Sequence, residues 1–264
     1  MEDYITIKFK GGTPLIATAI HNGHLLSENL LELSALNDSE RLREEDPFTG
    51  LWTDIAENSV VAHHSRFEFD LNRPPDKAIY LLPSDAWGLN LWKNQPPAET
   101  LSESLQRYRN IYSEIHKGLI ELLEEFGAIA IFDLHSYNHL RNGPDAPPED
   151  PALNPEVNIG TGTMDRNNWT ALVERFLADL RGYDFLGRNL DVRENIKFKG
   201  GYFPRWIHEK FNGSICCISI EVKKFFMDEW TGEPDHELLS TLQEALKSTV
   251  PGVLDELSKY KSNH

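Results

Sequence analysis

The sequence predicts an α/β fold in which a mixed, mostly parallel β-sheet is flanked by helices. Short apolar segments alternate with longer helical patterns along the 264 residues, and this rhythm is typical of strands joined by crossover helices. The 40% of hydrophobic residues suffices for a packed core. We find no internal repeat and no low-complexity linker, so we expect a single domain over residues 1–264.

The N-terminal part of the chain contains three expected strands, at residues 4–9, 15–20 and 59–62. The clearest helix comes later, where apolar residues recur three and four positions apart from Leu101 to Phe126 and Gly127 stands at the expected stop. The nearly all-apolar run that follows, 128–132, predicts a strand covered on both faces.

The second half continues the same alternation of helices and strands. We expect a helix over 169–180, a buried strand over 215–222 and a final helix over 236–260 that is interrupted at Pro251. Residues 142–155 contain five prolines and cannot form regular structure. A long loop directly after a strand is a place where lids tend to lie, so this segment is a candidate lid.

The charge balance excludes two classes of partner. The 26 Lys+Arg and 42 Asp+Glu residues give a net charge of −16, and no local basic patch is visible to grip nucleic acid or an anionic membrane. The start of the chain lacks the features of a signal peptide, and no apolar run approaches the ~18 residues of a membrane span. We therefore expect a cytoplasmic protein with a small-molecule partner, whose adjacent Cys216 and Cys217 are reduced core residues.

Three polar residues stand at or near the ends of apolar strands. His21 and His135 each follow an expected strand, and Glu221 lies within one. Ligands of open α/β sheets bind at the carboxyl ends of the strands, so these side chains are expected to meet. Taken alone, each histidine is more typical of a capping or core residue than of a ligand. A carboxylate among Ile, Cys and Val, by contrast, is costly unless it is paired, metal-bound or catalytic.

Other polar clusters have both a functional and a structural interpretation. His24 forms a weak H-x-x-H pattern with His21, and Glu44-Glu45-Asp46 is either a source of a carboxylate ligand or a solvated acidic run. The pair His63-His64 is interpreted as structural. Asn72 and Arg73, before two prolines, are a candidate carboxylate clamp, since a guanidinium group matches a carboxylate; the alternative is a surface ion pair for each of Arg66 and Arg73.

Six segments in order resemble the N-formylglutamate amidohydrolase family, over about residues 14–232. They are His21-Asn22-Gly23, Glu45-Asp46-Pro47-Phe48-Thr49, Ser65-Arg66-Phe67 with the 70–76 run, Asp133-Leu134-His135-Ser136, Lys199-Gly200-Gly201-Tyr202 and Ile220-Glu221-Val222. The same elements are similar to those of zinc carboxypeptidases and their amidohydrolase relatives. The resemblance implies a zinc-carboxypeptidase-like fold of the phosphorylase/hydrolase-like class.

The resemblance also implies one zinc ion per chain, held by His21, His135 and a carboxylate. Asp46 is the aligned acid, and Glu45 is the reserve. The carboxypeptidases take this ligand from the position three residues after the first histidine, where this chain has His24. The family usually shows Pro-His-Ser-Gly where this chain has Ile-His-Asn-Gly at 20–23, which marks a divergent branch.

The expected reaction is hydrolysis of a linear amide, and the resemblance implies that the substrate is N-formyl-L-glutamate, which would give formate and glutamate in histidine degradation. Glu221 would move the proton of the attacking water and Arg66 would stabilise the oxyanion. Asn72 and Arg73 would hold the α-carboxylate, and Arg205 the second carboxylate. Asp133 would orient the His135 imidazole. The alternatives are a metallopeptidase or deacylase acting on another carboxylate-bearing substrate, and a non-catalytic binder of acidic metabolites.

Overall fold

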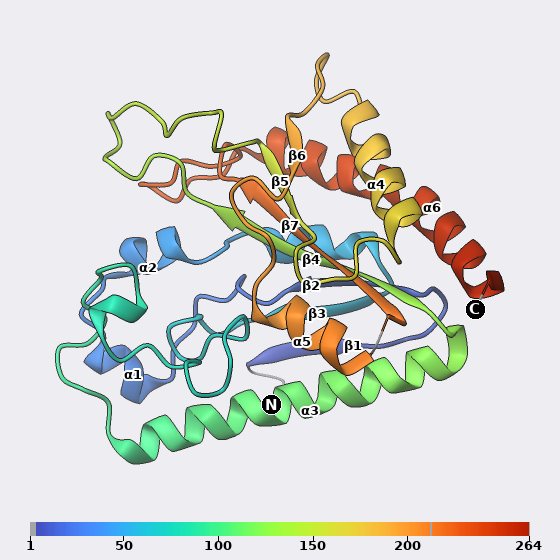
Figure 1. The fold of residues 1–264 in the computed structure, drawn as a ribbon. Coiled ribbons are helices and arrows are strands. Elements are labelled where there is room, and N and C mark those ends of the chain that lie inside the picture. The colour runs from blue at the N-terminus through green and yellow to red at the C-terminus, as the bar shows by residue number, and fades with distance from the viewer. Residues whose placement is uncertain (1–3, 212, 264) are drawn as a thin grey trace.

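The computed structural model describes residues 4–211 and 213–263, and all of its named strands belong to one sheet (Figure 1). The strands are β1 (Ile5–Lys8), β2 (Leu15–Ala19), β3 (Asn58–Ala62), β4 (Ile129–Tyr137), β5 (Val157–Gly160), β6 (Val192–Glu194) and β7 (Ile215–Lys223). Their order in the sheet is β1-β3-β2-β4-β7-β5-β6. The four central strands run parallel, while β1 and β5 are antiparallel to their neighbours β3 and β7. The predicted mixed, mostly parallel sheet is confirmed.

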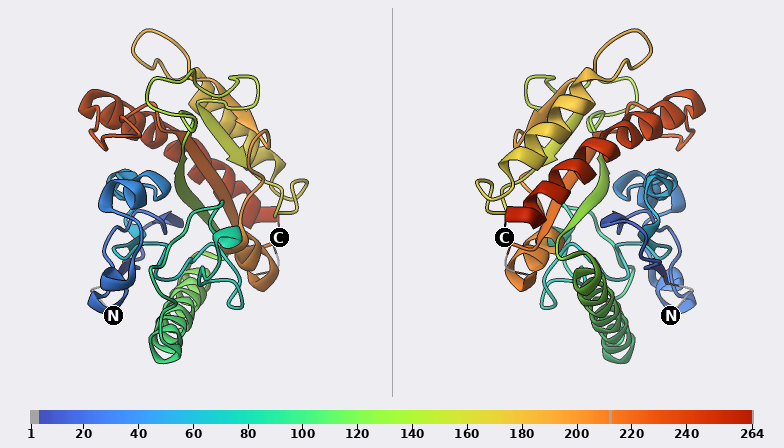
Figure 2. Two further views of the ribbon diagram at one scale, coloured as in Figure 1. Left: turned by 90° about the vertical axis from the view of Figure 1, so that its left-hand side faces the viewer. Right: turned by 90° about the vertical axis from the view of Figure 1, so that its right-hand side faces the viewer.

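Helices cover both faces of this sheet (Figures 1 and 2). The long helix α3 (Ala98–Phe126) and α5 (Tyr202–Phe211) lie on one face, and α4 (Thr170–Gly182) and α6 (His236–Asn263) lie on the other. Strand β4 serves both layers because its side chains alternate: Ile131 packs in the cluster under α3, whereas Phe132 packs on Phe176 of α4. The sheet is therefore buried on both sides, as a parallel sheet requires.

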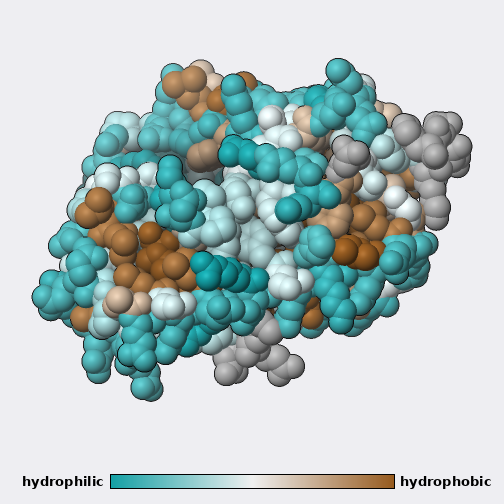
Figure 3. All heavy atoms as spheres, turned by 60° about the horizontal axis from the view of Figure 1, so that its bottom comes forward, coloured by the Kyte–Doolittle hydropathy of each residue, from teal (hydrophilic) through white to brown (hydrophobic). Residues whose placement is uncertain are grey.

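The remaining helices are short and lie in the loops after β2 and β3. They are α1 (Glu28–Leu33), α2 (Asp38–Glu44) and the 3₁₀ helices η1 (Thr49–Ile55) and η2 (Pro83–Asp85). Helix α2 begins with a capping box in which Asn37 and Glu40 satisfy each other's backbone N–H groups. On the side of the molecule that α3 occupies, the surface is mostly hydrophilic around separate apolar patches (Figure 3).

The predicted elements agree with the structure except at two points. The break at Pro251 is wrong: α6 is continuous, because the apolar residues on both sides of the exposed proline, Leu246 and Val253, are buried and hold the helix in place. Strand β4 also extends beyond the predicted run to Tyr137, and it is buried along its whole length. Both cysteines are free and buried, and residues 142–155 form an irregular loop, as predicted. None of the helices within the described ranges is long and apolar enough to cross a membrane.

A partly buried histidine, His208, joins α5 to the sheet. The backbone N–H of Cys217 donates to His208 Nε2 at 3.1 Å, so the proton on the ring is at Nδ1, which lies 3.1 Å from Thr163 Oγ1. Burial lowers the pKa of His208 to about 4. Protonation of the His208 ring would place a positive charge between α5 and the sheet, and Nε2 could no longer accept the hydrogen bond from Cys217.

We expect this histidine to make the fold sensitive to acid. The unfolded chain takes up the proton near pH 6.5 and the native chain only near pH 4, so stability falls as the pH falls through this interval, by about 2–3 kcal/mol in all. Urea unfolding at pH 7 and pH 4 will show a smaller loss in His208→Gln, which has no titratable group here. Equal losses in the two proteins would contradict the assignment.

Candidate active site

Two histidines meet at the carboxyl ends of neighbouring strands. His21 comes two residues after β2, and His135 lies near the end of β4, which pairs with β2 in parallel. Both side chains are about 2% exposed, and their ring centroids are 4.9 Å apart. Because parallel strands end at the same edge of the sheet, a pairing of β2 with β4 is sufficient to bring the two imidazoles together.

Each imidazole is oriented by a buried carboxylate at Nε2. Asp70 Oδ1 lies 2.7 Å from His21 Nε2, and Asp133 Oδ2 lies 3.0 Å from His135 Nε2. Asp133 is itself held by the hydroxyl of Thr18, which donates to Oδ1 at 2.7 Å. With the Nε2 protons directed to these acids, the Nδ1 lone pairs are the ones available to a ligand.

Asp46 faces both Nδ1 atoms. Its Oδ2 lies 2.9 Å from Nδ1 of His135 and 3.4 Å from Nδ1 of His21, and its backbone N–H donates to the His21 carbonyl at 3.0 Å. Burial alone would raise the pKa of Asp46, but the adjacent His135 and His21 rings hold it far below its ordinary value. The three ligand atoms lie within 4.8 Å of one another. Two imidazoles and one carboxylate, with ordered outer partners, form a donor set that suits zinc with a position left open.

The two alternatives for the carboxylate position point elsewhere. Glu45 turns away from the histidine pair, and its carboxylate contacts Nδ1 of His24 at 2.5 Å and accepts the hydroxyl proton of Ser65. These two consecutive residues therefore differ in role. Glu45 binds His24 and Ser65, whereas Asp46 faces His21 and His135.

Glu221 lies beside His135 in the sheet register, on β7. Its side chain lines the same cavity as the two histidines, and within the described ranges no group makes a hydrogen bond or ion pair to its carboxylate. Burial raises the pKa of Glu221 to about 7, against the opposing effect of His135. A carboxylate that is free and has a pKa near neutrality is suited to accept and release a proton.

Arg66 is linked to the histidine pair through Asp70. Its Nη2 donates to Asp70 Oδ2 at 2.8 Å, and Tyr80 donates its hydroxyl proton to the same carboxylate. Burial would raise the pKa of Asp70, but Arg66 and His21 hold it well below the ordinary value. The buried Asp70 carboxylate thus holds both the His21 imidazole and the Arg66 guanidinium in place. From the sequence, roles were assigned to its neighbours Asn72 and Arg73 but none to Asp70.

These groups line a cavity of about 340 Å³ whose charge differs from that of the whole chain. The chain carries a net charge of −16, yet cationic side chains outnumber acidic ones in the lining. The cations are Arg66, Arg141, Lys197, Lys199 and Lys224, and the acids are Glu44, Asp46 and Glu221. Such a cavity can receive an anion within an acidic protein.

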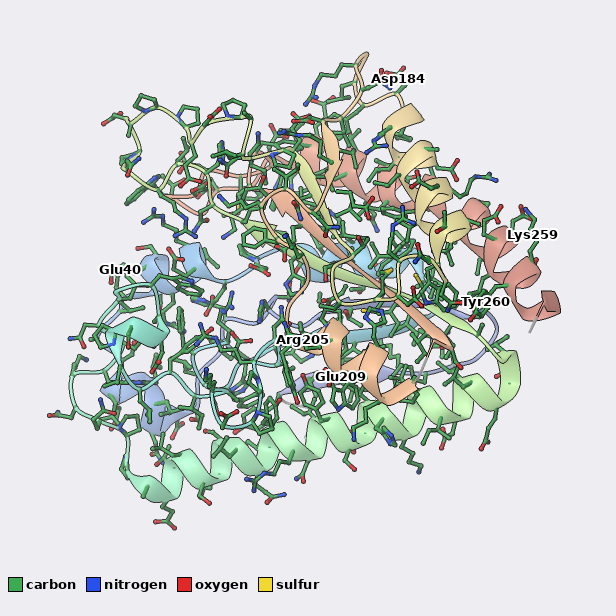
Figure 4. All side chains as sticks on the ribbon, in the orientation of Figure 1. Glu40, Asp184, Arg205, Glu209, Lys259 and Tyr260 are labelled. Carbon is green, nitrogen blue, oxygen red and sulfur yellow. The ribbon has the colours of Figure 1, made fainter. Side chains whose placement is uncertain are left out.

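The structure brings only part of the predicted carboxylate clamp into this cavity. Asn72 lines it, and its Oδ1 accepts the backbone N–H of Phe203 at the start of α5. Arg73 is not among the lining residues, because its guanidinium donates to the Asp85 carbonyl at 2.7 Å and stacks on Tyr80. Arg205 is exposed on α5 and is also outside the lining (Figure 4).

Cations that were not proposed as site residues from the sequence also line the cavity, among them Arg141, Lys199 and Lys224. Lys199 precedes Gly200 and Gly201 in one of the segments that carried the family resemblance, so it had a signal in the sequence. Arg141 and Lys224 had none, because a single basic residue in a loop or after a strand is indistinguishable from a surface residue.

The family model for N-formylglutamate amidohydrolase matches residues 13–227. The chain belongs to this family. The N-formylglutamate deformylase of Pseudomonas aeruginosa is 24% identical over 97% of both chains, and that of Pseudomonas putida is 26% identical over 74% of this chain and 75% of its own. A crystal structure of N-formylglutamate amidohydrolase from Ralstonia eutropha superposes with a TM-score of 0.70 at 18% identity, covering 99% of this chain and all of that one. The predicted family, the hydrolase class and the fold are confirmed.

Proposed function

We propose that this chain is a zinc-dependent amidohydrolase that cleaves N-formyl-L-glutamate into formate and L-glutamate. The observation that carries this proposal is the convergence of His21, Asp46 and His135 in a cation-rich cavity, beside Glu221, whose carboxylate has no partner among the described residues. The relatives named N-formylglutamate deformylase support the choice of substrate. With this substrate the reaction belongs to histidine degradation, and we place it in the cytoplasm.

His21, Asp46 and His135 would hold one zinc ion per chain through Nδ1, a carboxylate oxygen and Nδ1. When bound, zinc supplies a Lewis acid that lowers the pKa of water towards neutrality and polarises a carbonyl group. Asp70 and Asp133 keep both imidazoles in the tautomer that this role needs.

Glu221 would accept a proton from the attacking water and deliver it to the departing amine nitrogen. Its carboxylate can do so because no group in the described part of the chain makes a hydrogen bond or ion pair to it. Arg66 lines the same cavity and is bound to Asp70, the carboxylate that also contacts His21. Its guanidinium would stabilise the oxyanion. The hydrogen bonds from Arg66 to Asp70 hold the guanidinium in place before substrate arrives, which reduces the reorganisation that catalysis requires.

The substrate's two carboxylates would bind to Asn72 and to one cation of the cavity, Lys199. Asn72 accepts the Phe203 N–H through its Oδ1, and its Nδ2 has no acceptor among the described residues, so it can donate to the substrate. The side-chain ammonium of Lys199 has no hydrogen-bond or ion-pair partner among the described residues, whereas that of Lys197 pairs with Glu149 at 2.8 Å. We therefore assign Lys199, in place of Arg205, to the carboxylate farther from the reacting amide.

We expect Lys199→Ala to raise KM for N-formyl-L-glutamate about tenfold with little change in kcat, because a charge-assisted hydrogen bond at a partly solvated position contributes about 1.5 kcal/mol. Arg205→Ala is the matched control, since it removes an equally exposed cation outside the cavity and leaves KM unchanged. Steady-state formate release measures both. The reverse pattern would return the second carboxylate to Arg205.

The substrate assignment is tested by formate or acyl release from a panel of N-formyl and N-acyl amino acids. We expect the highest kcat/KM for N-formyl-L-glutamate, and a much lower value for N-formyl-L-glutamine, which lacks the second negative charge. A preference for an N-acetyl or peptide substrate would indicate a deacylase or peptidase instead. Binding of these compounds without turnover would indicate a non-catalytic binder.

A further inference from the structure

Lys224 is a buried lysine directly after β7, and no step of the proposed reaction uses it. Its side chain is about 1% exposed, and it follows Glu221 by three residues. Its ammonium donates to two backbone carbonyls, those of Arg43 at 2.6 Å and Glu45 at 2.7 Å. No carboxylate pairs with it among the described residues, although it lines the cavity that contains the histidines.

The two carbonyls belong to the end of helix α2. The last carbonyl groups of a helix have no partner within the helix and carry partial negative charge, so a cation is favourable there. Asn138, just after β4, donates its Nδ2 to the same Arg43 carbonyl at 2.8 Å. The ends of two neighbouring sheet strands, β4 and β7, are therefore attached to one helix end.

This helix end leads directly into Asp46. Lys224 binds the carbonyl of the residue just before Asp46, and the N–H of Asp46 is bound to the His21 carbonyl at 3.0 Å. The peptide that carries the aspartate is thus held from one side by β7 and from the other by the end of β2. We propose that Lys224 is a positioning residue that fixes Asp46 in reach of His21 and His135, and that zinc affinity depends on it.

The chemistry of a lysine suits this role. Burial of an ammonium is unfavourable unless its protons are bound, and here two fixed carbonyls bind two of them. Burial lowers the pKa of Lys224 to about 8, against Asp46 and Glu44, so the group remains predominantly protonated at neutral pH. One hydrogen of the ammonium is left for the cavity.

The inference rests on the proposed metal site, and zinc binding by metal-free protein tests it. The variant is Lys224→Met, which keeps the length of the side chain and removes all donors. We expect zinc affinity, measured by competition with a chromophoric chelator, to fall about 10- to 100-fold, the range for loss of an outer partner of a metal ligand. Lys224→Arg, which can donate to both carbonyls, should restore most of the affinity.

Lys223→Met is the matched control. Lys223 is the adjacent lysine and also donates to a backbone carbonyl, that of Asn154 at 3.2 Å, but it does not line the cavity. Its zinc affinity should equal that of the wild type. If Lys224→Met does not fold, Lys224→Gln, which keeps one amide donor, is measured instead, and a loss of affinity is again expected.

The possible outcomes separate the two proposals. Normal zinc affinity in Lys224→Met or Lys224→Gln would overturn the role of Lys224 and leave the proposed function intact. A raised KM with unchanged zinc affinity would also overturn it, because Lys224 would then be a group that binds substrate. A wild-type protein that binds no zinc would overturn both proposals, and this result is visible before any variant is made.

Discussion

Replacing Glu221 by Gln will lower kcat for N-formyl-L-glutamate about 100- to 10,000-fold, because general acid–base catalysis by a positioned side chain contributes a factor of this size. Glutamine has the same shape but cannot accept a proton. Glu221 lies on β7 opposite His135, and within the described residues nothing else binds its carboxylate, so the substitution disturbs no hydrogen bond of the fold. Formate release under single-turnover conditions, with zinc content measured on the same sample, checks the expectation.

The control for this experiment is Glu209→Gln, on the exposed side of α5, which should leave kcat unchanged (Figure 4). A variant Glu221→Gln that retains its full kcat would show that the proton is moved by another group. A loss of kcat accompanied by loss of zinc would show instead that Glu221 acts by supporting the metal.

Purified Asp46→Ala and His135→Ala will contain almost no zinc and will release formate no faster than a metal-free control. Removing one of three protein ligands leaves too few donors for a tight site. Asp70 and Asp133 cannot replace the lost ligand, because they contact the Nε2 atoms of His21 and His135, on the side of each imidazole away from Nδ1. Metal analysis of the dialysed proteins and titration with added zinc measure the effect.

His24→Ala distinguishes this arrangement from one in which His24 is the third ligand. His24 occupies the position three residues after the first histidine, but its Nδ1 is bound to Glu45 and it lies outside the ligand cluster. We therefore expect one zinc per chain in this variant. Zinc content that falls in His24→Ala and persists in Asp46→Ala would place the third ligand at His24.

The sequence was sufficient to predict that residues distant along the chain would meet. His21, His135 and Glu221 were expected at the carboxyl ends of strands, and they line one cavity at the ends of β2, β4 and β7. This inference succeeded because buried strands have a strong apolar signal and parallel strands end at the same edge. Strands β5 and β6 and helices α1, α2 and α5 are shorter, and no comparable signal marked them.

The direction of side chains in loops could not be predicted in the same way. Neighbouring acids such as Glu45 and Asp46 are chemically alike, and only the path of the backbone after α2 decides which of them faces the histidines. That Arg73 and Arg205 lie outside the cavity lining could not be predicted either, since a basic residue carries no signal that distinguishes a cavity wall from the surface of a loop or helix.

The pairing of β2 with β4 and of β4 with β7 has a consequence for how the chain folds. These parallel strands are far apart in the sequence, so they come together only after the segments between them have closed into place, and such non-local contacts form slowly. His21 and His135 have no common ligand until β2 and β4 are in register. Metal added during refolding would therefore bind only chains whose central sheet is already assembled, and the time course of its uptake would record that assembly step.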